Sequence, residues 1–328
     1  MPAPSPAAAR ALGLLLGVAV DAVLGDPRRA HPVAAFGRAA SWVEQRVYGD
    51  SRPRGVAYLS ACVVPVVLVA AGAERAVRER PWWRLALTAA GTWVVVAGTG
   101  LAREGASMAT ELERGDLAAG RARLRNLCAR EATSLDADAV ARATVESLAE
   151  NTSDAVVAPL VWGAVAGLPG LLGYRAVNTL DAMVGYHSPR YERFGWAAAR
   201  LDDVVNLAPA RLTALLTVAA ARSVGGSASR AWRVWRRDGH RHPSPNAGHP
   251  EAAAAGALGV RLGGRNVYDG YTEDRAALGE GPPRGSRTCG EPSVCVAVTA
   301  AAAAATAAGA WAATRPGGAL TSLRDLHP

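Results

Sequence analysis

The stretch ESLAENTSD, residues 146–154, carries three acids spaced four residues apart: Glu146, Glu150 and Asp154. On a helix, this spacing places all three side chains on one face. Like charges four residues apart repel each other, so such a helix requires a compensating positive charge. A metal ion, arginine side chains or a Mg²⁺-bound phosphate would supply it. The alternative is an exposed helix in which Arg142 pairs with the acids.

The acidic stretch runs directly into the apolar segment VVAPLVWGAVAGLPGLLG, residues 156–173. Two prolines, Pro159 and Pro169, and four glycines interrupt this segment. Such helix breakers favour a re-entrant hairpin buried in protein over a straight membrane span. Acids at the mouth of a membrane-scale apolar segment indicate a site rather than a surface.

Half of the 328 residues are hydrophobic, and further apolar stretches occur along the chain. A full helical span needs about 20 apolar residues. Four stretches approach that length, and a fifth, 207–222, is shorter. The four are 7–24, 56–73, 85–102 and 292–314. They carry almost no charge and show no clear amphipathic period, which argues against a large soluble helical protein.

We therefore predict an all-α, polytopic integral membrane protein with a single membrane-embedded domain over residues 1–328. Soluble helical loops are expected at 103–155 and 223–291, where polar residues dominate.

All basic side chains are arginines, and the formal net charge is +8. The absence of lysine excludes a P-loop and Schiff-base chemistry. Any phosphate must therefore be bound by arginines, whose bidentate geometry suits it. Nucleic-acid binding is not supported, because the arginines are scattered over many loops without a binding motif.

The arginine distribution predicts the orientation in the membrane. Loop 25–55 carries six arginines, whereas the tail before it has only Arg10, so this loop is expected in the cytoplasm. If 156–173 and 207–222 both cross the membrane, the region 174–206 lies outside, and if neither crosses, it lies on the cytoplasmic side with the other motifs. The helix breakers in 156–173 favour the second arrangement. We therefore expect a multi-pass protein of the cytoplasmic membrane, with every motif facing one cytoplasmic cavity.

The region 174–206 contains polar pairs at helical spacing, together with His187 in a turn before Ser188-Pro189. The pairs are Asn178 with Asp181, Arg200 with Asp203, and Asp202 with Asn206. Each pair alone is consistent with a cap or a salt bridge. Between apolar segments, however, buried acids are costly unless they are paired or bound to metal.

A third motif is HPSPNAGHPEAAAAGALGVRLGGRNVYDG, residues 242–270. Ser244 and Asn246 precede a predicted helix over 251–262 that ends at Gly263. The start of this helix offers N–H groups to an anion, and Glu251 would tolerate a Mg²⁺-bound one. An ordinary capped helix explains the same residues.

The fourth motif is GDPRRAHP, residues 25–32, in which Asp26 and His31 are candidate site residues. A plain turn followed by an extended His-Pro pair is equally consistent with it.

Four runs in order resemble the adenosylcobinamide-phosphate synthase family of cobalamin biosynthesis. They are GDPRRAHPVAAFGR (25–38), ESLAENTSDAVVAPLVWG (146–163), AVNTLDAMVGYHSPRYERFGWAAARLDDVVNLAPAR (176–211) and the third motif. The resemblance covers most of the chain, from about residue 11 to the final apolar segment.

The resemblance implies a membrane enzyme that uses ATP to join adenosylcobyric acid to (R)-1-amino-2-propanol or its O-phosphate. The new bond is an amide at a propionate side chain of the corrin ring. The expected cofactors are ATP and Mg²⁺, and the lipid bilayer is a partner. Association with later enzymes of nucleotide-loop assembly stays open, as does the phosphorylation state of the amine.

On this resemblance, we assign roles to the motif residues as a hypothesis. Mg²⁺ is expected at Glu146, Glu150, Asp154 and Asp203. Arg200 is the candidate phosphate clamp, and His187 or His249 is the candidate base. The remaining candidates for binding nucleotide and substrate are Asn151, Asn178, Asp181, Asp202, Asn206, Ser244, Asn246, Glu251, Asp26 and His31.

Two alternatives come from the residues themselves. An intramembrane prenyltransferase would hold Mg²⁺-diphosphate with Asp and Asn clusters such as NTLD and RLDDVVN, but it leaves the third motif unexplained. A transporter or corrinoid-binding protein would also place acids and broken helices within the membrane. Clusters on three separate polar loops argue against that second alternative.

Overall fold

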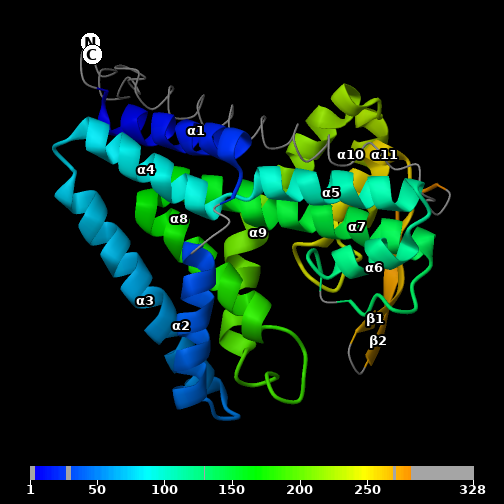
Figure 1. Ribbon diagram of the computed structural model, residues 1–328, viewed down its shortest axis with the longest axis horizontal. Coiled ribbons are helices and arrows are strands. Elements are labelled where there is room, and N and C mark those ends of the chain that lie inside the picture. Colours follow the sequence, from blue (N-terminus) through cyan, green and yellow to red (C-terminus); the bar gives the residue numbers. More distant parts are fainter. Residues whose placement is uncertain (1–3, 27–30, 129, 269–270, 282–328) are drawn as a thin grey trace, which may run out of the picture.

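The computed structural model describes residues 4–26, 31–128, 130–268 and 271–281. Figure 1 shows the long apolar helices α1, α3, α4 and α8 toward one end of the molecule, and α10, α11 and the strands toward the other. Apart from one two-stranded hairpin, the regular structure of these residues is helical, which confirms the predicted all-α class. The predicted span 292–314 lies outside the described residues.

The first two predicted spans are confirmed as helices. They lie within α1 (Pro6–Leu24) and α3 (Arg52–Ala76). Helix α2 (Pro32–Val47) stands between them in the chain, and α4 (Pro81–Val95) follows α3. Gly13 and Gly17 of α1 leave no room for a Cβ against α4. Such small residues allow two helix backbones to approach closely within a bilayer.

Two stretches differ in detail from their prediction. The expected span 85–102 lies within Pro81–Glu113, which is long and apolar enough to cross a membrane, but it is broken where α4 ends at Val95 and α5 begins at Gly98 and runs to Glu113. At the break, Ala97 N donates to Ala155 O (3.1 Å). The expected loop 25–55 contains α2, whose first turn is capped by His31 Nδ1, the acceptor for Val33 N (3.2 Å).

The acidic stretch and the apolar segment after it form a bent hairpin. α7 (Ala137–Thr152) continues through the π-helical turn η1 (Ser153–Val157) into α8 (Ala158–Val184). Gly167 lies within α8 with φ 66° and ψ −152°, a conformation that is essentially restricted to glycine. A Cβ at Gly170 would meet the carbonyl of Trp162, so the chain folds back on itself. The hairpin predicted from the proline and glycine breakers is therefore present.

The tip of this hairpin contacts the ends of other apolar helices. Leu168 N donates to Glu74 Oε2 of α3 (3.2 Å), and Arg10 Nη1 of α1 donates to Ala164 O (3.2 Å). Because the chain reverses at the tip, the end of α8 returns to the side where α7 ends. Residues before and after the hairpin can therefore share one site.

The remaining helices complete the other end of the molecule. The predicted soluble part 103–155 contains α5, α6 (Leu117–Leu124) and α7, as expected. Beyond the hairpin follow α9 (Trp196–Ala220), the 3₁₀ turn η2 (Ala221–Val224) and α10 (Ala228–Asp238). Asn246 Nδ2 donates to Asp203 O (2.8 Å), so the chain after α10 returns to the first third of α9.

The third motif differs from its predicted structure. Its helix, α11, spans Gly248–Leu258 rather than 251–262, and Gly259 in the left-handed conformation (φ 71°) ends it. After α11 come β1 (Leu262–Tyr268) and β2 (Tyr271–Leu278), an antiparallel pair within a region predicted to be helical loops.

Five stretches of the described chain are long and apolar enough to cross a membrane: Pro6–Leu24, Arg52–Ala76, Pro81–Glu113, Ala137–Val184 and Trp196–Val224. Large apolar side chains such as Leu68 and Val69 of α3 are exposed. Lipid would cover such side chains, and the fold is that of a polytopic membrane protein.

Candidate functional site

A cavity of about 610 Å³ lies where the acidic stretch, the ends of α8 and α9, and the loop before α11 meet. Most of the predicted site residues line it. These are Glu150, Asp154, Asp181, His187, Arg200, Asp202, Asp203, Asn206, Ser244 and Asn246. Three of the four sequence motifs therefore contribute to one space.

Asn178 and Asn206 hold the acids of the inner wall in place. Asn178 Nδ2 donates to Asp154 Oδ2 (3.4 Å) and to Asp202 Oδ1 (3.3 Å). Asn206 Nδ2 donates to the other oxygen of Asp202 (2.9 Å), and its own Oδ1 accepts from Tyr174 OH (2.9 Å). The i,i+4 spacing on α9 brings Asp202 and Asn206 together, as predicted.

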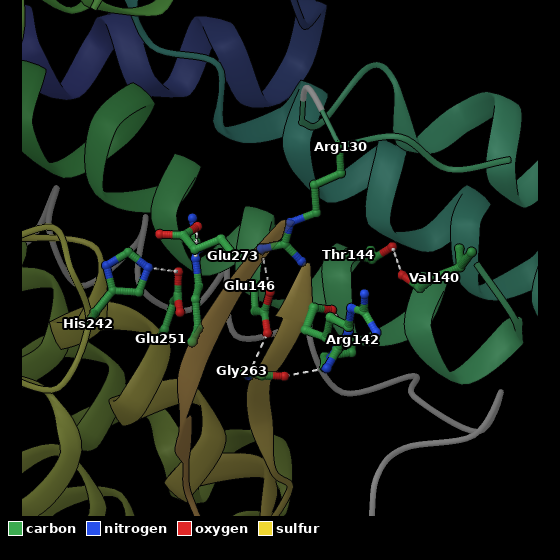
Figure 2. A network of polar contacts seen from close by, with 11 residues as sticks. Arg130, Val140, Arg142, Thr144, Glu146, His242, Glu251, Gly263 and Glu273 are labelled. Atoms are coloured by element: carbon green, nitrogen blue, oxygen red, sulfur yellow. Dashed lines mark hydrogen bonds and ion pairs between the residues drawn. The ribbon is translucent and has the colours of Figure 1, made fainter. Parts of the chain in front are cut away.

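The three acids of the ESLAENTSD stretch have different surroundings. Glu150 and Asp154 line the cavity, whereas Glu146 faces the β-hairpin and is only 1 % exposed (Figure 2). Its carboxylate lies 2.5 Å from Arg130 Nη2 and accepts a hydrogen bond from Gly263 N (2.7 Å). The compensating charge at Glu146 is thus an arginine.

The alternative in which Arg142 pairs with the acids is wrong. Figure 2 shows the Arg142 guanidinium directed to the β-hairpin. It donates to the carbonyl oxygens of Gly263 and Arg265.

The predicted metal set is not assembled. Within the parts of the chain that the structure describes, no three His, Cys, Asp or Glu side chains gather closely enough to hold a metal ion. Glu146 is turned toward Arg130, away from the cavity that Glu150, Asp154 and Asp203 line. A metal held by all four acids is therefore not supported.

The two candidate bases lie in different places. His187 is at the rim of the cavity, with its side chain 85 % exposed and Nδ1 2.9 Å from Glu192 Oε2. His249 does not line the cavity, and its Nδ1 accepts a hydrogen bond from Trp235 Nε1 (2.9 Å). Burial lowers the pKa of His249 to about 4. Of these two candidates, only His187 is therefore placed to act on a ligand in the cavity.

Four other candidates do not reach the cavity. Asn151 donates to the carbonyls of Ser147 (2.7 Å) and Leu127 (3.3 Å), and His31 caps α2. Asp26 faces the charges of His31, Arg175 and Arg103, and burial raises its pKa. Glu251 is buried behind the cavity. The prediction that all four motifs face one cavity is therefore wrong for Asp26 and His31, the two candidates of GDPRRAHP that the structure describes.

His242 lines the cavity and was not selected from the sequence. Its Nδ1 accepts from Ser244 N (3.0 Å), which leaves the proton on Nε2, 3.9 Å from Glu251 Oε1 (Figure 2). Burial lowers the pKa of His242 to about 4. Burial also raises the pKa of Glu251, and the charges of Glu146 and Glu150 raise it further. The Ser and Pro turn residues of the HPSPN run are the sequence signal that could have indicated the hydrogen bond between Ser244 N and His242.

The rim of the cavity carries further residues that sequence reasoning missed. The Arg52 guanidinium lies 5.0 Å from the ring centroid of Trp196, a cation–π geometry. Tyr186 and Tyr191 pack edge to face beside them. Arg275 and Glu273 reach the cavity from β2. These residues come from three separate parts of the chain, at 52, 186–196 and 273–275, so only the fold brings them together.

The fold and the site together define a class: a multi-pass helical membrane protein with one acid- and amide-lined cavity where its helices end. The profile of the family described as CobD/Cbib protein matches residues 14–291. The chain therefore belongs to the CobD/CbiB family, which acts in cobalamin biosynthesis.

Several relatives carry the name Cobalamin biosynthesis protein CobD. The protein from Mycobacterium tuberculosis (strain ATCC 25618 / H37Rv) is 52% identical over 272 residues, which cover 83% of this chain and 86% of that protein. The Geobacter metallireducens protein is 44% identical, with 81% and 86% covered. The Rhizobium meliloti protein is 42% identical, also with 81% and 86% covered. No solved structure matches the chain.

Proposed function

We propose that the protein is an ATP-dependent amide-forming ligase. It joins adenosylcobyric acid to (R)-1-amino-2-propanol or its O-phosphate and yields adenosylcobinamide or its phosphate. The observation that carries this proposal is the cavity, which carboxylates from α7, α8 and α9 line together with amide side chains and the arginines Arg52, Arg200 and Arg275. Membership in a cobalamin-biosynthesis family favours a ligase over the prenyltransferase and transporter alternatives.

A carboxylate does not acylate an amine unaided in water. In the proposed reaction, the corrinoid carboxylate takes the terminal phosphoryl group of ATP and releases ADP. The amine nitrogen then attacks the resulting acyl phosphate and displaces inorganic phosphate. This chemistry depends on positioning and on charge compensation for the phosphoryl oxygens.

The residues of the cavity fit Mg²⁺-ATP by their donor chemistry. Mg²⁺ prefers oxygen ligands and is usually held by one or two carboxylates together with substrate phosphates. One or two of Asp181, Asp202 and Asp203 would hold it together with the nucleotide phosphates, so no all-protein cage is needed. Bound Mg²⁺ would neutralise charge on the phosphate oxygens.

Arg200 is the proposed phosphate clamp. Its guanidinium lies at the cavity, 3.5 Å from Asp203 Oδ2, and its side chain is largely exposed. An arginine with free N–H groups can bind phosphoryl oxygens in a bidentate manner. His187 is the proposed acceptor for the ammonium proton, because it is the candidate base that lines the cavity.

We further propose that the cavity opens to the cytoplasm. The loop before α3 carries the arginine excess that marks a cytoplasmic loop, and Arg52 at its end lines the cavity. The chain after α9 also favours a cytoplasmic position for the cavity. α10 carries four arginines and an aspartate, and such a charged helix is unfavourable within lipid. The loop after α10 returns to Asp203 near the start of α9.

The experiment that tests the proposal is conversion of adenosylcobyric acid by membranes that contain the full chain. Each amine is supplied with and without ATP, and products are identified by mass. We expect an amide product with at least one amine. One ADP and one phosphate should form for each amide. Amide formation without ATP, or no product with either amine, would overturn the proposal.

A further inference from the structure

Among the described residues, three polar atoms of cavity-lining side chains lack a hydrogen-bond partner. His242 Nε2 lies 3.9 Å from Glu251 Oε1, and the other two are Ser153 Oγ in the π-helical turn and Asn246 Oδ1 in the loop before α11. Both residues line the cavity, yet they are only 2 % and 8 % exposed. Buried polar groups in folded proteins are almost always paired, so two unpaired oxygens on residues that line the same cavity indicate a ligand.

The loop holds Asn246 in a fixed orientation. Its Nδ2 donates to Asp203 O (2.8 Å), which leaves Oδ1 as the free acceptor. Ser244 Oγ accepts from Asn246 N (3.2 Å), and His242 Nδ1 accepts from Ser244 N (3.0 Å). The missing partner of Asn246 is therefore a hydrogen-bond donor.

The charge of this wall selects a positively charged donor. Glu150 lies three residues before Ser153 on the same helical face and also lines the cavity. Arg275 of β2 also lines the cavity, and it pairs with Glu273 (2.8 Å). A carboxylate, an amide oxygen and a hydroxyl in one wall suit the three N–H donors of a primary ammonium group.

We propose that Glu150, Ser153 and Asn246 bind the primary ammonium group of the amine substrate. This inference rests on the proposed function and adds where the amine is bound. Mg²⁺ is the competing occupant of an oxygen-rich wall. It is disfavoured because this group offers one carboxylate beside two neutral oxygens, whereas Asp181, Asp202 and Asp203 supply carboxylates for Mg²⁺ elsewhere in the cavity.

The test uses the full-length protein in detergent or lipid and the variant Ser153→Ala. Alanine removes only an unpaired hydroxyl, so its unfolding temperature should equal or exceed that of the wild type. The KM for 1-amino-2-propanol should rise about tenfold, the loss expected for one hydrogen bond to a charged group. The KM for ATP should not change. Thr217→Val is the control, because its buried hydroxyl is satisfied by Thr213 O (2.9 Å) away from the cavity.

Ligand-induced thermal stabilisation provides a readout that needs no turnover. We expect 1-amino-2-propanol to stabilise the wild type, 1,2-propanediol not to, and Ser153→Ala to lose the effect. If the wild type is active and Ser153→Ala keeps both its KM for the amine and the stabilisation, the inference is overturned while the proposed function stands. A change in Mg²⁺ dependence alone would also overturn it. If no amide is formed but the amine still stabilises the wild type through Ser153, the proposed function fails and the site stands.

Discussion

Replacement of Glu146 by alanine tests whether this acid has a structural role, in contrast to Glu150 and Asp154, which line the cavity. Glu146 and Arg130 are 1 % and 6 % exposed at their side chains and lie 2.5 Å apart. Removing one partner of such a buried ion pair typically costs about 3–5 kcal/mol. Gly263 N also loses its acceptor in the Oε1 atom of Glu146, which adds about 1 kcal/mol. The expected loss is therefore about 4–6 kcal/mol, a large share of the stability of a typical domain.

The assay is reversible unfolding in mixed micelles, followed by circular dichroism, for matched variants. Glu146→Gln should lose less stability than Glu146→Ala, because its amide oxygen can still accept from Gly263 N. Glu150→Gln is the control, since it removes one like charge from an acidic cavity and should leave stability unchanged or higher. If Glu146→Ala were as stable as the wild type, or if Glu150→Gln lost as much stability, the assignment of a structural role to Glu146 would be refuted.

Three further predictions address the hairpin, the loop before α11 and the topology. Gly167→Ala should lower the free energy of unfolding by about 1–3 kcal/mol, because its φ of 66° is strained for alanine. Gly72→Ala in α3, where a Cβ meets nothing within 4 Å, should not, and equal losses would contradict the hairpin. Burial lowers the pKa of His242 from 6.5 to about 4, so in this window only the unfolded chain gains the proton and stability falls as the pH decreases. His242→Gln should flatten the measured fall between these pH values, and an unchanged slope would refute the burial argument. In a cysteine-free background, an impermeant maleimide should label His187→Cys only from the cytoplasmic side and Arg78→Cys, in the turn after α3, only from the other. Labelling of both from one side would contradict the proposed topology.

Local composition predicts much of the fold because each helix in lipid must satisfy its own backbone. The apolar runs at 7–24 and 56–73 are therefore confirmed as helices, and the breakers around Gly167 predict the hairpin. The break between Val95 and Gly98 was not predictable in this way. It is fixed by a tertiary contact, in which Ala97 N donates to Ala155 O, and apolar composition continues across it.

The candidate site was predictable where spacing on one helix determines contact. Asp202 and Asn206 lie together because they are four residues apart on α9. Contacts between residues on different helices or strands leave no such spacing pattern in the sequence. The sequence therefore indicated that Glu146 needs a positive partner but not that Arg130 supplies it. It also did not indicate that the helix before Gly259 ends early enough for β1 to cover Glu146.

The central claim is that the cavity acids carry an ATP-dependent amide ligation. Its most direct test is the rate of conversion of adenosylcobyric acid in membranes that contain Glu150→Gln or Asp203→Asn, compared with the wild type at equal protein levels. We predict that each variant loses about two orders of magnitude in rate, as expected when one preorganised electrostatic group is removed from an active site. Full ligase activity in both variants would contradict the claim.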